Sequence, residues 1–197
     1  MNPKKGVIQN KVYDINKYIE NVKPNKIYID VAGVLLHSCQ AVIDVCKQTY
    51  GYNSKITGKD IVSWNFKELD NFDDDVIEYL FSCYSFFKYV KWIDGALDFI
   101  KSHEKDIIIV TKGNNVNIYK KMRMFSKLNL NVPVCGLPLS CSKNSINMDG
   151  GLLIDDCTKN LNESNATYKI QFLEYNDGMN DVREWTKNWN GLKMYHW

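Results

Sequence analysis

The sequence predicts an α/β fold with a parallel sheet and a small helical insertion, and three observations support this prediction. Apolar runs rich in β-branched residues alternate with segments of helical periodicity along the chain, as in βαβ units around a parallel sheet. Hydrophobic residues make up 45% of the 197 residues and charged residues 24%, a balance that allows a substantial buried core. One segment, residues 51–90, interrupts the alternation with an acidic, aromatic-rich stretch of short helical patterns.

The first predicted strand lies in residues 26–36, KIYIDVAGVLL, a β-rich apolar run that reaches Asp and then Gly. Such a run is typical of a buried strand that leads into a tight loop. A helix is expected from Ser38 to Tyr50, because apolar residues recur there at helical spacing and Gly51 follows as a stop signal. Residues 38–90 are therefore interpreted as a helical cap inserted after the first strand.

The alternation resumes after residue 90. A helix is expected at 94–103, followed by the strand DIIIVT at 106–111 and a Lys-rich amphipathic helix at 115–128. Further strands are expected at 132–137, 151–154 and 168–172, and a last helix at 181–188. The predicted organisation is an N-terminal extension of residues 1–25, a core of residues 26–37 and 91–197, and a cap of residues 38–90.

The composition excludes several classes of protein. The chain has 25 basic and 23 acidic residues, whereas a binder of nucleic acid polymers or acidic membranes needs a strongly basic face. The longest aliphatic stretch, residues 107–110, is too short to cross a bilayer, and the first 25 residues contain no signal-peptide pattern. The six cysteines are scattered without zinc-ligand spacing, as expected of reduced thiols. We therefore expect a cytoplasmic protein without a nucleic acid or membrane partner.

Chemically versatile residues stand where the predicted strands end. The first strand ends at Asp30, the second at Thr111, and a late strand at Asp155 and Asp156. Lys143 lies in the loop before that late strand. Because ligands of open α/β sheets bind beyond the carboxyl ends of the strands, these side chains are expected to share one crevice.

This set of side chains suits phosphoryl transfer. Carboxylates on separate strands can hold Mg²⁺, which keeps several waters and uses only one or two protein carboxylates together with substrate phosphate. With the metal neutralising charge, a carboxylate can attack phosphorus and form an aspartyl-phosphate. The chain has 23 lysines and only 2 arginines, so a phosphate would be held mainly by Lys, hydroxyls, backbone N–H groups or a metal.

Four motifs resemble those of the haloacid-dehalogenase-like (HAD) phosphatase superfamily: IDVAGVLL, IIIVTKGN, Lys143 within SCSKNSI, and GGLLIDDCTKNL. At finer grain the chain is similar to the 5'(3')-deoxyribonucleotidase family, through YSFFKYVKWIDGALDFIK, GGLLIDDCTKNL and the terminal YHW. The resemblance implies a Rossmann-like HAD core with a helical cap inserted after the first strand. It also implies a Mg²⁺-dependent phosphohydrolase whose small phosphorylated substrate is a deoxynucleoside monophosphate.

The resemblance gives each motif residue a role. Asp30 would be the nucleophile and a metal ligand, and Asp155 would complete the metal site, with Asp156 ligating directly or through water. Thr111 and Lys143 would grip the phosphate, and Lys143 would also damp repulsion between the nucleophile and the incoming anion.

Four further residues are expected to contact the substrate. Lys112 and Gly113 directly follow the second strand-end motif, and Lys112 is a credible substitute for the phosphate-binding lysine. Trp64 and Phe87 lie in cap stretches similar to family segments that face the nucleobase, where stacking contributes roughly 1–3 kcal/mol per base. Judged by residue type alone, such aromatics are more often part of the core.

Position 32 departs from the family pattern. The residue there is normally an Asp that serves as general acid and ligates the metal through its backbone carbonyl, but this chain has Ala32. The carbonyl is retained, whereas a methyl group cannot protonate a leaving group, and positioned acid–base groups contribute roughly 10²–10⁴-fold.

Three interpretations of Ala32 follow. The chain is an ordinary nucleotidase in which Ala32 was engineered and slows turnover, or a natural pseudo-phosphatase that binds nucleotides without hydrolysing them. In the third interpretation it resembles the phosphonoacetaldehyde hydrolases, which have Ala at this position and a Schiff-base lysine from the cap. The cap lysines available for that chemistry are Lys55, Lys59 and Lys67.

Overall fold

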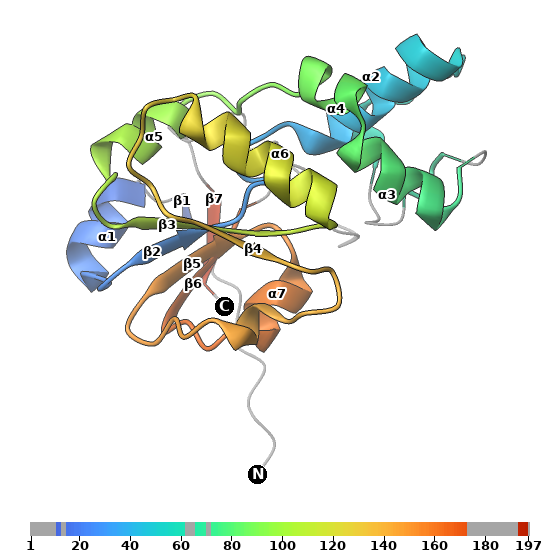
Figure 1. The fold of residues 1–197 in the computed structure, drawn as a ribbon. Coiled ribbons are helices and arrows are strands. Elements are labelled where there is room, and N and C mark those ends of the chain that lie inside the picture. Colours follow the sequence, from blue (N-terminus) through green and yellow to red (C-terminus); the bar gives the residue numbers. More distant parts are fainter. Residues whose placement is uncertain (1–10, 13–14, 62–65, 70–71, 173–192, 197) are drawn as a thin grey trace.

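The computed structural model describes residues 11–12, 15–61, 66–69, 72–172 and 193–196, and these form a seven-stranded sheet (Figure 1). The strands are β1 (Lys11–Val12), β2 (Ile27–Ile29), β3 (Ile107–Lys112), β4 (Val134–Leu137), β5 (Leu152–Asp155), β6 (Tyr168–Gln171) and β7 (Lys193–His196). Their order across the sheet is β1-β7-β6-β5-β2-β3-β4. The five strands β2 to β6 pair in parallel, which confirms the predicted α/β fold.

The first parallel strand, β2, lies in the middle of the five parallel strands. From β2 the chain proceeds to β3 and β4 on one side, then crosses to β5 and β6 on the other. Such a switch point leaves a crevice at the carboxyl ends of the two strands where the order reverses. β7 pairs antiparallel with β6 and with β1, and neither β1 nor β7 was expected from the sequence.

Seven helices are present among the described residues: α1 (Ile15–Val22), α2 (Ser38–Tyr50), α3 (Asp74–Ser82), α4 (Tyr84–Tyr89), α5 (Ala96–Ser102), α6 (Asn115–Ser126) and α7 (Thr158–Glu163). Short 3-10 turns occur at η1 (Gly58–Asp60) and η2 (Lys143–Ser145). Helix α2 has the predicted bounds and ends at Gly51, whose φ of +66° is a left-handed conformation that glycine adopts without strain. The helix predicted at 181–188 lies outside the described residues.

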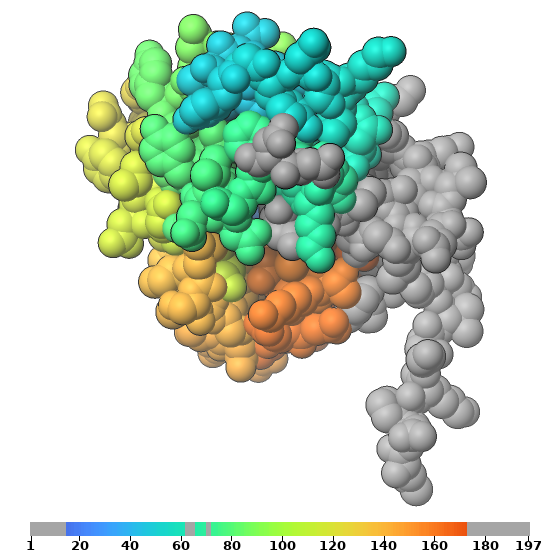
Figure 2. All heavy atoms as spheres, turned by 90° about the vertical axis from the view of Figure 1, so that its right-hand side faces the viewer, coloured from blue at the N-terminus to red at the C-terminus, as the bar shows by residue number. Residues whose placement is uncertain are grey.

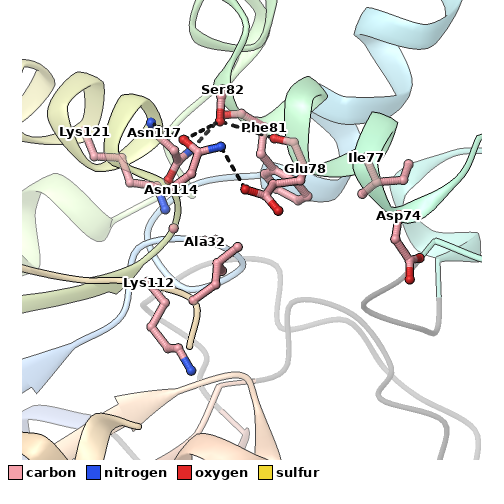
Figure 3. Close-up of a pocket in the computed structure, with 12 residues that line it drawn as sticks. Ala32, Asp74, Ile77, Glu78, Phe81, Ser82, Lys112, Asn114, Asn117 and Lys121 are labelled. Atoms are coloured by element: carbon pink, nitrogen blue, oxygen red, sulfur yellow. Dashed lines mark hydrogen bonds between the residues drawn. The ribbon is translucent and has the colours of Figure 1, made fainter. Parts of the chain in front are cut away.

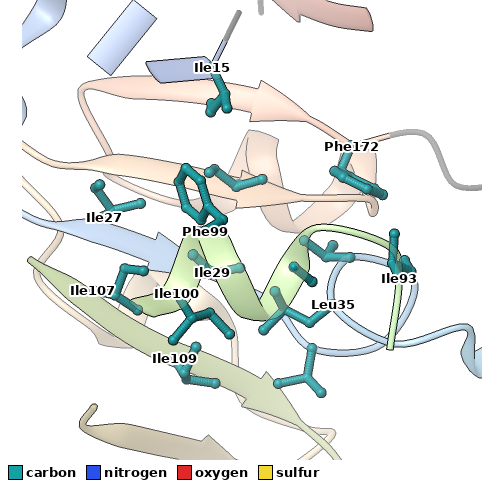
Figure 4. Close-up of a cluster of buried hydrophobic side chains, with 14 of the residues drawn as sticks. Ile15, Ile27, Ile29, Leu35, Ile93, Phe99, Ile100, Ile107, Ile109 and Phe172 are labelled. Carbon is teal, nitrogen blue, oxygen red and sulfur yellow. The ribbon is translucent and has the colours of Figure 1, made fainter. Parts of the chain in front are cut away.

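The sheet has a hydrophobic cluster on each face, because successive residues of a strand point to opposite sides. Ile27 and Ile29 of β2 belong to a cluster that also contains Phe99 of α5 (Figure 4). Tyr28, between them, belongs to a second cluster with Leu161 of α7. The core is therefore a three-layer arrangement of helix, sheet and helix. The polar residues at the carboxyl ends of the parallel strands lie at one edge of the sheet.

Residues 38–90, the segment interpreted as a cap, have their own hydrophobic cluster. It is built from apolar residues of α2, α3 and α4 and includes Val42, Leu80 and Phe86, which are fully buried. In the space-filling view this segment, blue to green, lies above the orange part of the chain that contains β5, β6 and α7 (Figure 2). In the part of the chain that the structure describes, we find no helix long and apolar enough to cross a membrane.

Candidate functional site

Two of the predicted strand-end carboxylates meet at a buried lysine. Lys143 Nζ donates hydrogen bonds to Asp30 Oδ1 and Asp155 Oδ2, each at 2.5 Å, and to the carbonyl of Val110 at 3.2 Å. The register of β2 and β5 pairs residue 29 with residue 154, so the two carboxylates emerge side by side. Because Val110 belongs to the motif IIIVTKGN, all four sequence motifs are thereby brought into direct contact.

The electrostatics of this contact keep the lysine charged. Burial by itself would lower the pKa of Lys143, but the carboxylates of Asp30 and Asp155 outweigh it and raise the pKa above its ordinary value. For Asp155, burial raises the pKa, Lys143 lowers it, and Asp30 raises it, with an upward net direction. The ammonium therefore compensates negative charge that would otherwise be costly to bury.

The two carboxylates at the end of β5 are held differently. Asp155 Oδ1 accepts hydrogen bonds from the backbone N–H of Cys157 at 2.8 Å and from Asn160 Nδ2 at 3.2 Å, and its other oxygen accepts from the lysine ammonium. Asp156 is half-buried, and its Oδ2 lies so close to Gly33 that a Cβ there would be 2.1 Å away. Glycine at 33, with φ of +73°, is therefore required for this approach.

The donor set at the ends of β2 and β5 fits a small, hard cation. Asp30 has a second carboxylate oxygen besides the one bonded to Lys143. Asp156 packs against Gly33 in the loop that follows β2, and the carbonyl of Ala32 belongs to the same loop. Among the described residues no group of three or more His, Cys, Asp or Glu side chains forms a denser metal site. Mg²⁺ suits such a sparse oxygen set because it retains several waters.

A second buried lysine, Lys121, joins the site from α6 and was not expected there from the sequence. Its Nζ donates a hydrogen bond to Thr111 Oγ1 at 2.8 Å, and the residue is only 2% exposed. Burial lowers the pKa of Lys121 to about 8, while Asp30 raises it, Lys143 lowers it and Asp156 raises it. The hydroxyl predicted to bind phosphate is thus paired with a cation.

The sequence pattern of α6 did not single out Lys121. The buried residues of α6 include Asn117, Lys121 and Phe125, which recur every four positions and so share one helix face. A lysine at the centre of an inward face is unusual, because lysines are rarely fully buried without a partner. Apolar residues of the same helix, such as Val116 and Tyr119, are exposed instead, so hydrophobic periodicity does not distinguish Lys121 from the exposed lysines.

A cavity of about 400 Å³ opens beside these strand ends, between the core and α3 (Figure 3). The core contributes Ala32 and the strand-end residues Lys112 and Gly113 to its wall, together with Lys121. The remaining lining residues are Asp74, Ile77, Glu78, Phe81, Ser82, Asn114, Asn117 and Leu139. The methyl group of Ala32 therefore lies on the same cavity as the buried lysine.

The predicted aromatic contacts are placed differently. Among the described residues that line the cavity the aromatic ring is Phe81, not Phe87. Phe87 packs edge to face against Phe86, with ring centroids 5.1 Å apart, and Lys120 Nζ lies 5.4 Å from its ring. Trp64 lies outside the described residues. Resemblance of the flanking sequence gave no information on which aromatic faces the cavity.

Hydrogen bonds connect the cap to the core at the edge of the cavity. Ser82 Oγ donates to Asn114 Oδ1 at 2.9 Å, and Asn114 Nδ2 donates to Glu78 Oε1 at 3.1 Å. Asn117 Nδ2 donates to the carbonyl of Phe81 at 2.6 Å. Because Asn114 also caps α6 by accepting from the N–H of Asn117, α3 is bonded directly to the helix that follows the strand-end threonine.

Comparison with known proteins gives resemblances at the level of solved structures. No protein-family model matches the chain, and no curated protein matches it. A Bacillus subtilis protein described as a HAD-hydrolase, YfnB, bound to magnesium, aligns with a TM-score of 0.46 and 15% identity over 69% of this chain and 79% of that one. A Deinococcus radiodurans HAD family hydrolase with bound phosphate and sodium has a TM-score of 0.46 and 14% identity over 70% and 74%. A Geobacter sulfurreducens HAD-superfamily hydrolase of subfamily IA aligns with a TM-score of 0.46 and 10% identity over 75% of this chain and 86% of that one.

Proposed function

We propose that the chain is a Mg²⁺-dependent phosphohydrolase of the HAD type that acts on nucleoside monophosphates through an aspartyl-phosphate on Asp30. The observation that supports this most is the contact of one lysine, Lys143, with both Asp30 and Asp155 at the switch point of the sheet. The resemblance of the motifs to the deoxyribonucleotidases supports the nucleotide substrate, and Asp30, Thr111 and Asp155 lie at the ends of parallel strands.

In the proposed reaction an oxygen of Asp30 attacks phosphorus, and the bond from phosphorus to the ester oxygen breaks with its electron pair leaving on that oxygen, which takes a proton from solvent water. Water then attacks the phosphoryl group, which releases inorganic phosphate and restores the carboxylate. In this proposal Lys121, which lines the cavity and donates to the Thr111 hydroxyl, and Lys112 would hold phosphoryl oxygens. Lys143 holds Asp30 in position.

Mg²⁺ would be held by Asp30, Asp156 and the carbonyl of Ala32, with Asp155 fixing Lys143 beside them. When bound, the metal neutralises charge on the phosphoryl oxygens. Asp156 is proposed as a direct ligand because its carboxylate lies against Gly33, next to Ala32, whereas Asp155 is engaged by Lys143, Cys157 and Asn160.

Ala32 supplies no proton to the leaving oxygen, so turnover is expected to be slow. The second candidate, a nucleotide-binding pseudo-phosphatase, is favoured by the same methyl group, because it lines the cavity where the family places an acid. The C–P hydrolase interpretation is weaker. Among the described lining residues the lysines come from the core, whereas Lys55, Lys59 and Lys67 of the cap are exposed.

Restoring the acid tests the proposal. Ala32→Asp is expected to increase phosphate release from deoxynucleoside monophosphates by roughly 10²–10⁴-fold in the presence of Mg²⁺. The matched control is Ala32→Asn, which has nearly the same shape but cannot donate a carboxyl proton and should remain slow. Phosphate release is measured over a panel of nucleotides and other phosphate esters, with and without Mg²⁺.

Two outcomes would overturn parts of the proposal. If Ala32→Asp binds nucleotides but releases phosphate from no ester of the panel, the pseudo-phosphatase is the correct interpretation. If Asp30→Asn, added to Ala32→Asp, leaves turnover unchanged, Asp30 is not the nucleophile. Circular dichroism of each variant checks that the fold is retained, because Asp30 is also a partner of Lys143.

A further inference from the structure

The cavity has opposite charges on its two sides. Lys112 and Lys121 line it from the core, and Asp74 and Glu78 line it from α3 of the cap. Asp74 and Glu78 are four residues apart and therefore lie on one face of the helix. In Figure 3 Lys121 and Asp74 lie at opposite ends of the view, with Glu78 and Ala32 between them. A phosphate held by the lysines would direct the rest of its ester toward the two carboxylates.

The α3 side of the cavity offers hydrogen-bond acceptors to a ligand. Asn114 and Asn117, which lie on the core side, each donate one N–H of the side-chain amide, to Glu78 Oε1 and to the carbonyl of Phe81 respectively. Among the described residues, the Asp74 carboxylate and Glu78 Oε2 have no hydrogen-bond partner. Ionised carboxylates only accept hydrogen bonds, so this wall favours a ligand that presents N–H or O–H groups and disfavours one that presents carbonyl oxygens.

We infer that Glu78 and Asp74 select nucleotides whose base carries an exocyclic amino group over those with a carbonyl at the same position. This inference rests on the proposed function, since it assumes that a nucleoside monophosphate occupies the cavity. A carboxylate accepts a hydrogen bond from the amino group of cytosine, whereas the carbonyl oxygen of uracil would face the carboxylate without a proton between them. Asn114 fixes the Glu78 side chain by its hydrogen bond, so the acceptor is oriented before the ligand arrives.

Matched pairs of nucleotides test the selection without requiring turnover. We expect dCMP to bind the unmodified chain at least about fivefold more tightly than dUMP, and dAMP more tightly than dIMP, by isothermal titration calorimetry with Mg²⁺. Each pair differs in an amino group against a carbonyl oxygen and in the adjacent ring nitrogen, which carries a proton only in dUMP and dIMP. In the double variant Glu78→Gln/Asp74→Asn the ratio is expected to fall to about one, because an amide can donate as well as accept.

The control is Asp75→Asn, which removes a charge from the same helix at an exposed residue outside the lining and should keep the preference. Equal binding of dCMP and dUMP to the unmodified chain, or an undiminished preference in the double variant, would overturn this inference alone. Binding of inorganic phosphate without binding of any of the four nucleotides would overturn it together with the proposed nucleotide substrate.

Discussion

Two lysines are buried beside the candidate site, and their surroundings differ. Lys143 contacts two carboxylates, and these raise its pKa. Lys121 contacts a hydroxyl, and burial lowers its pKa to about 8. Both are almost inaccessible to solvent, at 0% and 2% exposed. The difference lies in whether an anion of the protein compensates the charge.

The comparison separates two tasks of a phosphate site. A lysine that is paired with carboxylates stabilises the native arrangement but has little charge left for a ligand. A lysine without a directly bonded carboxylate is costly to bury, and an incoming anion would recover that cost. Destabilising arrangements of this kind are common in proteins at positions where function requires them. Lys143 holds the carboxylates, and we propose that Lys121 holds the phosphate.

The largest effect on stability is expected when the lysine that is paired with carboxylates is replaced. Lys143→Met leaves the buried carboxylates of Asp30 and Asp155 without their cation, so we expect the free energy of unfolding to fall by about 3–5 kcal/mol. The measurement is denaturant unfolding at pH 7. Lys159→Met is the matched control, because Lys159 is exposed and 3.8 Å from Glu163, and should change stability by less than about 0.5 kcal/mol. Equal losses in both variants would show that the buried pair has no special role.

Replacing the second lysine, Lys121, is expected to increase stability. Burial moves the pKa of Lys121 from 10.5 to about 8, which costs about 3 kcal/mol at neutral pH. Lys121→Met removes that cost but leaves the Thr111 hydroxyl without its donor, so a net gain in stability of about 2 kcal/mol is expected. Inorganic phosphate should bind at least about tenfold more weakly by calorimetry. A loss of stability with unchanged phosphate binding would mark Lys121 as structural.

The smallest effect, expressed per pH unit, is the pH dependence of the free energy of unfolding that Lys121 causes. Its pKa is lower in the folded chain than in the unfolded one, so between about pH 8 and 10.5 the unfolded chain binds more protons. The free energy of unfolding therefore rises with pH across this window, by at most about 1.4 kcal/mol per pH unit. Phosphate affinity falls over the same range, because the ammonium is lost. Both slopes are measured as the difference between the unmodified chain and Lys121→Met, which removes the contributions of other titrating groups. A difference independent of pH would contradict the assignment.

Much of the fold could be read from local patterns. The span of α2 was predicted to the residue, because its apolar periodicity and its glycine stop are both local signals. The parallel strands were located within one or two residues by their apolar runs. β1 and β7 were missed, since neither contains an apolar run and both form by antiparallel pairing beside the parallel strands.

The candidate site, like the fold, was predicted only in part from the sequence. The sequence by itself determined which residues stand at strand ends, including Asp30, Thr111 and Asp155, and that position 32 lacks a carboxyl group. Only the tertiary structure decided that Lys143 bridges two carboxylates, that Lys121 reaches Thr111, and that α3 places its own carboxylates on the cavity. The physical reason is that a motif fixes residue type and order, whereas charge compensation, burial and the pKa of each lysine depend on neighbours that are distant along the chain.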